Sequence, residues 1–538
     1  MSNTAALEHE ARPPRSPGSA APAATGRGLR GNPWLTLIAV ALGVMMVALD
    51  GTVVAIANPE IATDLDASLG DLQWVTNGYL LALAVFLIPA GKLGDRYGHR
   101  NIFLVGAIGF VLTSVAIGVT GNITALIGLR VLQGLFGAML QPTALGLLRS
   151  SFPPAKLNMA IGIWGAAISA ASAAGPIVGG LLVQHIGWES VFFVNAPLGA
   201  VAIVVGLLVL SDTRTPGAAG RIDLPGVALL SAAMFCLVWG VIKSTDHGWG
   251  SGYTLAFLGG FVVLLLAFAG WQTRAAEPLM PLKLFRNRSF SSGVVLMIFM
   301  AFGMFGALFF LTFYLIGVGG LSPVEAGVRM LPLTVMMVVG SAVSGAAIGR
   351  FGPRVPMMAG LVITSGSMFW MTRLDADASL ASTAPCFALL GFGISPIMIA
   401  ATDVIVGNAP VELAGVASGI QQAAMQVGGA LGTAVLGAVM AAKVTSSLPG
   451  HWAAQGLGPL SGDAVDTMKD PVSQGQAPIA PGTPPELAAK ISHAAHASFL
   501  DGMHLAFMIG AIAFACAISL ALLVRSGERR EGAVPVHV

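Results

Sequence analysis

Two opposite charges lie inside apolar segments of this chain, where a charge is costly to bury. Asp50 stands in the first apolar segment and Arg130 in the fourth. The rise of a helix places Asp50 roughly 12 Å and Arg130 roughly 10 Å from the same predicted outer surface. Separating a buried aspartate from a nearby arginine changes the proton affinity of the carboxyl group. We therefore predict that the two residues pair and couple to protons; the alternative is a static structural ion pair.

The composition places these segments in a lipid bilayer. Charged residues make up 10% of the chain, against about a quarter of a soluble domain. Hydrophobic residues make up 55%, and the mean hydropathy is +0.81. Apolar windows of about 20 residues predict an all-α polytopic membrane protein with fourteen transmembrane helices, at 34–57, 73–90, 101–120, 123–148, 157–184, 190–210, 224–243, 254–273, 290–316, 327–348, 355–373, 383–408, 413–441 and 499–523.

Lysine and arginine are distributed unequally between the predicted loops. Twenty lie in the N-terminal tail, the C-terminus and alternate loops, and six lie on the opposite side. Positive residues favour the cytoplasmic side, so both termini are predicted to be cytoplasmic. Residues 1–33 resemble a disordered tail and not a signal peptide, and residues 526–538 form a second tail. The segment 443–497 is rich in Gly, Pro and Ala and predicts a long, flexible external loop.

An internal repeat divides the chain. The run that begins at Gly91, Gly-Lys-Leu-Gly-Asp-Arg, recurs in weaker form at 349–354 as Gly-Arg-Phe-Gly-Pro-Arg. Each copy follows the second helix of a predicted unit. The repeat predicts a six-helix half at 34–211 and another at 290–525, with two inserted helices and their linkers at 212–289.

The first copy of the repeat is a dense charged cluster between two apolar segments. Its glycines permit a sharp turn and close backbone approach, its basic residues mark the cytoplasmic side, and its aspartate supplies an anion for a helix end or an arginine. An ordinary basic hairpin is the alternative. The cluster consists of Gly91, Gly94, Asp95, Arg96, Gly98 and Arg100, with Lys92 beside them.

The fifth apolar segment is dominated by small residues. They allow helices to pack closely, and a Gly-Pro pair within the segment predicts a bend. Ordinary small-residue packing is the alternative. The motif consists of Gly165, Gly175, Pro176, Gly179 and Gly180.

Together these segments resemble the major facilitator superfamily, and within it the fourteen-helix drug:proton antiporter family of the EmrB/QacA type. The resemblance covers nearly everything from residue 34 to 525. It implies proton-coupling roles for Asp50 and Arg130, and it assigns a cytoplasmic gate to the charged cluster at 91–100, through Asp95 and Arg96. The glycine-rich fifth segment resembles the motif of the antiporters in this superfamily. The resemblance also implies a proton gradient as the driving force, with no cofactor.

Other polar and aromatic side chains are candidates for proton or substrate binding. Asp403, about six residues from the inner end of its segment, is predicted to accept a proton or attract a cationic compound; a polar residue at the membrane interface is the alternative. Aromatic side chains suit lipophilic substrates, although such stripes also meet lipid or neighbouring helices. The candidates for the substrate cavity are Tyr79, Gln133, Gln141, Trp164, Phe305, Phe309, Gln422 and Gln426.

Several function classes are disfavoured by what the sequence contains. The net charge of +2 implies no nucleic-acid partner. We find no catalytic triad, phosphate-binding glycine loop or metal-ligand spacing, and each of the three cysteines sits in an apolar run. We predict a plasma-membrane exporter, not an enzyme, that exchanges protons for small hydrophobic or cationic compounds. The alternatives are an exporter of a dedicated metabolite or lipid and a proton-coupled nutrient importer.

Overall fold

The computed structural model describes residues 29–211, 223–377, 379–409, 414–480 and 482–524, and this part of the chain is helical throughout, without strands. Residues 1–28 of the predicted tail at 1–33, and the whole of the predicted tail at 526–538, lie outside the described residues. The α-helices are α1 (Pro33–Asp64), α2 (Leu69–Tyr97), α3 (His99–Gly118), α4 (Ile123–Ser151), α5 (Pro154–His185), α6 (Ser190–Phe193), α7 (Asn195–Val209), α8 (Leu224–His247), α9 (Gly252–Arg274), α10 (Arg288–Phe313), α11 (Pro323–Arg329), α12 (Leu331–Phe351), α13 (Arg354–Met371), α14 (Leu380–Gly407), α15 (Ala414–Ala454), α16 (Gly462–Ser473) and α17 (Pro485–Ala521).

Thirteen helical segments of the described chain are long and apolar enough to cross a membrane. The predicted segment 355–373 is present as α13, which has 18 residues and is not among the thirteen. Arg354 and Pro356 stand in its first turn and lower its hydropathy. The chain is therefore a multi-span helical protein, and the count of fourteen spans stays a prediction.

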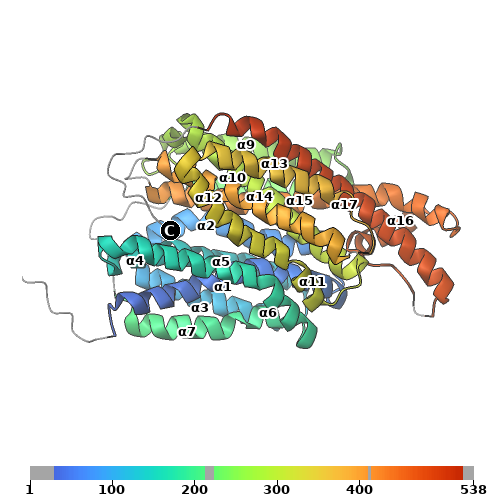
Figure 1. Cartoon of the computed structure of the whole chain (residues 1–538), viewed down its shortest axis with the longest axis horizontal. Helices are drawn as coiled ribbons and strands as arrows, with labels where there is room; N and C mark the ends of the chain where they lie inside the picture. Colours follow the sequence, from blue (N-terminus) through green and yellow to red (C-terminus); the bar gives the residue numbers. More distant parts are fainter. Residues whose placement is uncertain (1–28, 212–222, 378, 410–413, 481, 525–538) are drawn as a thin grey trace, which may run out of the picture.

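The helices form two groups that lie side by side in Figure 1. In the first group α1, α3, α4, α5 and α7 pack around one another, and in the second α10 and α12–α17 do so. Helix α2 joins the groups, because it packs on α4 and on α15. The pair α8 and α9 lies against α2 and α15 through α8. This arrangement places α1, α2, α10 and α15 at the boundary between the groups.

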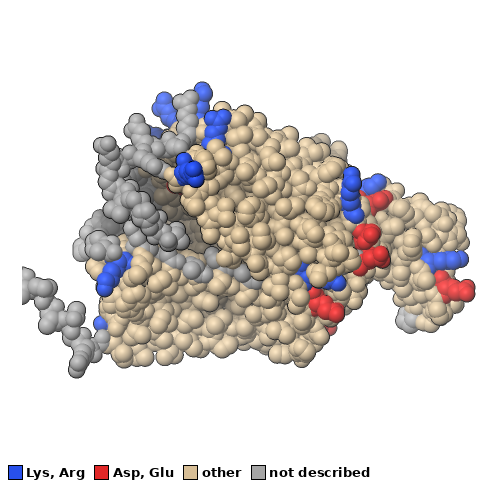
Figure 2. All heavy atoms as spheres, viewed as in Figure 1, with Lys and Arg blue, Asp and Glu red and all other residues tan. Residues whose placement is uncertain are grey.

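The two ends of the bundle differ in charge. We call them the α2–α3 end, where the chain passes from Tyr97 to His99, and the α11 end. Figure 2 shows lysine and arginine side chains around the α2–α3 end, where the surface is hollowed between the two groups. The acidic side chains visible in that view gather at the α11 end. Basic side chains are visible at the α11 end as well, so in this view the two ends differ chiefly in their acidic side chains.

Glycines of α15 allow its backbone to touch α10. A Cβ atom at Gly432 would collide with the carbonyl oxygen of Phe302, and one at Gly428 with that of Ile298. In a bilayer, helices gain little from hydrophobic association, so such close backbone packing contributes much of their cohesion. The short distance between α10 and α15 therefore depends on these glycines.

A buried aspartate fastens the α8–α9 pair to the chain that follows it. Asp223 caps α8 by accepting from the amide of Gly226 at 2.9 Å. It also accepts from Trp271 Nε1 at 2.6 Å, Gln272 Nε2 at 2.6 Å and the amide of Leu279 at 3.3 Å. Burial alone would raise the pKa of Asp223, but these four donors together hold that pKa below its usual value. The ionised carboxylate thus joins two helices and a turn.

The charged cluster at 91–100 interrupts the helices over fewer residues than predicted. Helix α2 continues to Tyr97, so the prediction that Gly91 and Gly94 form a turn was wrong. Only Gly98 breaks the helix, with a φ of 93° that glycine alone adopts freely. Gly94 still provides close approach, since a Cβ there would lie 2.6 Å from His99 Nδ1. Lys92, Leu93 and Arg96, which lie between the glycines, are good helix formers and favour extension of the helix past its apolar part.

The predicted flexible loop at 443–497 is also wrong, because most of the segment is helical. Helix α15 continues to Ala454, α16 occupies Gly462–Ser473, and α17 begins at Pro485. Alanine favours helix in these extensions, and Ser461 caps α16 by accepting from the amide of Ala464 at 3.3 Å. Pro485 begins α17, but Pro449 and Pro471 lie inside α15 and α16, so glycine and proline do not make the whole segment irregular.

Replacing Gly432 with Val should destabilise the protein, because the added side chain meets the backbone of α10 at Phe302. We expect a cost of about 1–3 kcal/mol, seen as a lower thermal midpoint in detergent. The control is Gly259→Val in α9, where no atom lies within 4 Å of an added Cβ. Equal thermal midpoints for the two variants would rule out close α10–α15 packing.

Candidate functional site

The structure brings Asp50 of α1 and Arg130 of α4 together in the interior. Arg130 Nη1 donates to Asp50 Oδ2 at 2.5 Å, and both side chains are buried. Arg130 Nε also donates to the carbonyl oxygen of Val75 in α2, at 3.0 Å. The proximity expected from their predicted depths is present, and the contact to Val75 connects a third helix to the pair.

The other oxygen of Asp50 belongs to a hydrogen-bonded ring that also contains the uncharged side chains of Gln133, Ser114 and Asn195. Gln133 Nε2 donates to Asp50 Oδ1 at 3.0 Å and to Ser114 Oγ at 2.6 Å. Asn195 Nδ2 donates to the same two oxygens, at 3.3 Å and 3.0 Å. Both hydrogens of each amide nitrogen are therefore used, and Asp50 Oδ1 accepts two of them. The ring suits an ionised carboxylate, because a proton on Oδ1 would compete with two N–H donors.

Aromatic rings support the arginine from the side. The guanidinium carbon of Arg130 lies 4.1 Å from the ring centroid of Tyr79 and 5.7 Å from that of Phe192. The hydroxyl of Tyr79 donates to the carbonyl oxygen of Val47 at 3.2 Å, which fixes the ring against α1. Ring faces are electron-rich and attract a cation, so Tyr79 helps to hold Arg130 toward Asp50.

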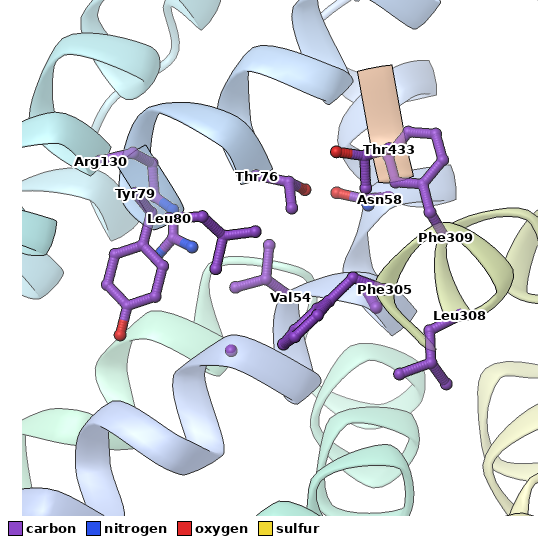
Figure 3. A pocket seen from close by; sticks show the side chains of 12 residues that line it. Val54, Asn58, Thr76, Tyr79, Leu80, Arg130, Phe305, Leu308, Phe309 and Thr433 are labelled. Atoms are coloured by element: carbon purple, nitrogen blue, oxygen red, sulfur yellow. The ribbon is translucent and has the colours of Figure 1, made fainter. Parts of the chain in front are cut away.

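A small cavity lies next to Arg130, at the boundary between the two groups of helices (Figure 3). The predicted cavity residues Tyr79, Phe305 and Phe309 line it. Its volume is about 20 Å³, enough for about one water molecule. The full lining is Gly51, Val54, Ala55, Asn58, Thr76, Tyr79, Leu80, Arg130, Phe305, Leu308, Phe309 and Thr433.

The other predicted cavity residues lie elsewhere. Gln133 belongs to the ring around Asp50. Gln141 accepts from Gln422 Nε2 at 2.9 Å, which joins α4 to α15 across the boundary between the groups. Gln426 is buried and Trp164 is half-buried, and neither lines the cavity beside Arg130. The set predicted from composition is thus divided between the ring, a bridge and the cavity.

The glycine motif of α5 lies between α1 and α11. A Cβ at Gly175 would collide with Thr52 Oγ1 of α1, and one at Gly180 with the carbonyl oxygen of Pro323 in α11. From the other side, a Cβ at Gly327 of α11 would lie 2.5 Å from the carbonyl oxygen of Pro176. The backbones of α5 and α11 therefore touch. Because α11 leads directly into α12 of the second group, this contact joins the two groups at the α11 end.

The rest of the motif shows which glycines matter for this contact. A Cβ at Gly179 would lie 3.2 Å from the carbonyl oxygen of Val53, so this glycine also faces α1. No atom lies within 4 Å of an added Cβ at Gly165. Among the glycines of this motif, close approach to a neighbouring helix is thus confined to those in the C-terminal half of α5.

Two hydrogen bonds add to the α5–α11 contact in holding the two groups of helices together at the α11 end. The amide of Val324 in α11 donates to Gln184 Oε1 of α5 at 3.2 Å. Gln474, which follows α16 and is buried, donates through Nε2 to the carbonyl oxygen of Ala67 at 3.0 Å. Each bond links the first group of helices to the second.

The predicted gate residues lie at the α2–α3 end, away from Asp50. Arg100 Nη2 donates to the carbonyl oxygen of Leu207 at 3.2 Å, and Lys92 Nζ lies 3.8 Å from Glu277 Oε2. Arg96 is exposed. The side chain of Asp95 lies outside the described residues. Contacts from this segment therefore reach α7 and the chain after α9.

Asp403 does not belong to the buried network. It lies in α14 and is exposed, whereas Asp50 is fully buried. No hydrogen bond or ion pair recorded for Asp50 or Arg130 in the described chain involves Asp403. The structure thus separates the two acids that the sequence grouped together.

Sequence reasoning missed Ser114, Asn195 and Asn58 as site residues. All three are fully buried polar residues in apolar segments. The rule that singles out Asp50, which asks why a polar group lies in a membrane segment, applies to them in weaker form. Asn195 also marks the break between α6 and α7 inside the single predicted segment 190–210.

Comparisons with known proteins agree with this architecture. The family model of the Major Facilitator Superfamily matches residues 40–433. The tetracenomycin C resistance and export protein of Streptomyces glaucescens is 55% identical over 506 residues, 94% of each chain. The multidrug efflux pump LfrA of Mycolicibacterium smegmatis is 33% identical and covers 87% of this chain and 92% of its own length.

Solved structures show the same fold at low sequence identity. A bacterial homologue of the human lysosomal transporter Spinster, in an inward-facing and occupied conformation, has a TM-score of 0.63 at 18% identity. The match covers 90% of this chain and 95% of that one. The family-model match and the close relatives, with the multi-span helical fold, establish that this chain belongs to the major facilitator superfamily.

Proposed function

We propose that the protein is a proton-driven antiporter that exports small molecules, including antibiotics, across the plasma membrane. The observation that carries the proposal is the Asp50–Arg130 ion pair, buried in the bundle and beside a cavity between the helix groups. Relatives that are named for tetracenomycin C export, puromycin resistance and multidrug efflux support the direction of transport. The partners are then the substrate, protons and lipid, and no cofactor is needed.

Asp50 carries the proton in this mechanism. The ring and Arg130 stabilise the ionised carboxylate through three N–H donors. A proton on Asp50 removes the negative charge that compensates Arg130, and an uncompensated buried charge is strongly unfavourable. The helices that contribute to the ring must then rearrange, so proton binding favours another conformation of the bundle.

Alternating access follows from the two ends of the bundle. We assign the α2–α3 end, with its basic residues, to the cytoplasm. The hollow in Figure 2 then opens inward, while the α5–α11 contact and the bond from Gln474 to Ala67 close the outer side. Transport requires these outer contacts to break while the inner side closes, through motion of the half at 34–211 against the half at 290–525.

Removal of the Asp50 charge should abolish proton-driven export. We expect Asp50→Asn to lose substrate accumulation in inverted vesicles energised with a proton gradient. Because Arg130 is then uncompensated, at a cost of about 3–5 kcal/mol, the double variant Asp50→Asn/Arg130→Gln serves as a folded control without buried charge. Gradient-dependent export at the normal rate by either variant would exclude a coupling role for Asp50.

The ring around Asp50 should matter beyond its contribution to folding. Ser114→Ala removes the oxygen that accepts from Gln133 and Asn195. A loss of about 1.4 kcal/mol from this network corresponds to roughly tenfold slower export. The control is Thr113→Val at the neighbouring position, since the Thr113 hydroxyl bonds only within α3. If both variants export equally well in vesicles, the ring has no part in coupling.

Closure of the outer side should depend on Gly180. A valine there cannot fit against Pro323, so we expect Gly180→Val to lose export and to let protons leak, seen as faster decay of a pH gradient in vesicles. Gly165→Val in the same helix meets open space and should behave as the wild type. A tight, active Gly180→Val variant would show that this contact is not required.

A further inference from the structure

The cavity between the helix groups contains a buried amide whose polar atoms have no partner. Asn58 of α1 is fully buried, and within the described part of the chain neither its Oδ1 nor its Nδ2 has a hydrogen-bond partner. Figure 3 shows this side chain beside Thr433 and Phe309. A buried polar group is unfavourable unless it is hydrogen-bonded, so a site of this kind favours a ligand that both donates and accepts.

Asn58 is the one amide among the described residues that line the cavity, beside the hydroxyl groups of Thr76 and Thr433. The hydroxyl of Thr433 already lies 2.5 Å from Asn77 Oδ1 and donates to it. Phe305 and Phe309 of α10 also line the cavity, and Phe309 lies beside Asn58. A planar molecule that stacks on or against these rings would present its edge to Asn58.

The charge of the lining discriminates between classes of compound. Arg130 is the one charged residue among the described side chains that line the cavity, and it is a cation. Asp50 does not line the cavity, and its carboxylate is occupied by Arg130, Gln133 and Asn195. A cationic compound would therefore lose its hydration without gaining a carboxylate partner. A neutral compound avoids that cost.

We propose that Asn58 and the rings of Phe305 and Phe309 form a subsite for neutral aromatic compounds that carry hydroxyl or carbonyl groups, in preference to permanent cations. This inference rests on the proposed export function. At about 20 Å³, the cavity admits only the polar edge of a larger molecule in this conformation. Asn58 then binds that edge, while the remainder of the ring system extends along the boundary between the helix groups.

The wild-type protein provides the first test, which needs no variant. Inverted vesicles are given a proton gradient and either 1,8-dihydroxyanthraquinone, which is neutral and oxygen-bearing, or tetraphenylphosphonium, a permanent cation. We expect gradient-dependent uptake of the anthraquinone at least tenfold above that of the cation. Equal uptake of the two, or a preference for the cation, would overturn the inference.

Variants at position 58 test the assigned contact. We expect Asn58→Leu to raise the KM for dihydroxyanthraquinone roughly tenfold, since the apolar side chain of similar size removes the hydrogen bonds. Asn58→Asp adds a carboxylate and should gain uptake of tetraphenylphosphonium. Thr312→Val is the control, because Thr312 is buried in α10, bonds within its own helix and does not line the cavity. An unchanged KM in a folded Asn58→Leu variant would refute the role of Asn58.

The outcomes separate this inference from the proposed function. If the wild type exports other compounds in a gradient-dependent way but not the anthraquinone, the substrate class is wrong and the antiport mechanism stands. If the wild type exports no compound of a broad panel when the gradient is applied, the antiport mechanism itself fails.

Discussion

The fold depends on compensating one buried pair of charges. Asp50 and Arg130 can remain inside an apolar bundle only because groups from several helices satisfy them. The contacts come from α1, α2, α3, α4 and α7. Loss of one charge leaves the other unpaired at a depth where water cannot replace it, so the protonation state of Asp50 and the packing of these five helices are linked.

Helix α1 connects this pair to the closure at the α11 end. Asp50 lies two residues before Thr52, and Thr52 is the residue that Gly175 of α5 approaches closely. On its far side α5 touches α11 through Gly180. In the mechanism that we propose, a shift of α1 that follows a change at Asp50 would therefore act on the helix that closes the α11 end. This contiguous packing would carry the effect of proton binding to the gate without a separate signalling element.

The sequence alone was enough to single out charged residues in apolar segments, because burying a charge is costly. It was also enough to predict which of them lie at the same depth, because the rise of a helix is constant. The depths of Asp50 and Arg130 came from helix rise, and their proximity is present. Ser114 and Asn195 could not be placed, because their contacts to Asp50 depend on how α3 and α7 pack. The predicted loop at 443–497 was wrong because its composition was taken as irregular, whereas alanine favours the extensions of α15 and α17 and Ser461 caps α16. At Gly91, α2 continues through the glycine to Tyr97, where a turn was expected.

The central claim is that Asp50 exchanges its proton when substrate binds. Purified protein in weakly buffered detergent solution, with a pH-sensitive dye and an exported compound added, measures this exchange directly. We expect addition of substrate to release protons from the wild-type protein and to release none from the Asp50→Asn variant. Thermal melting should show that both proteins are folded. Equal proton release from the two proteins would contradict the claim, and would place the exchanging group elsewhere in the chain.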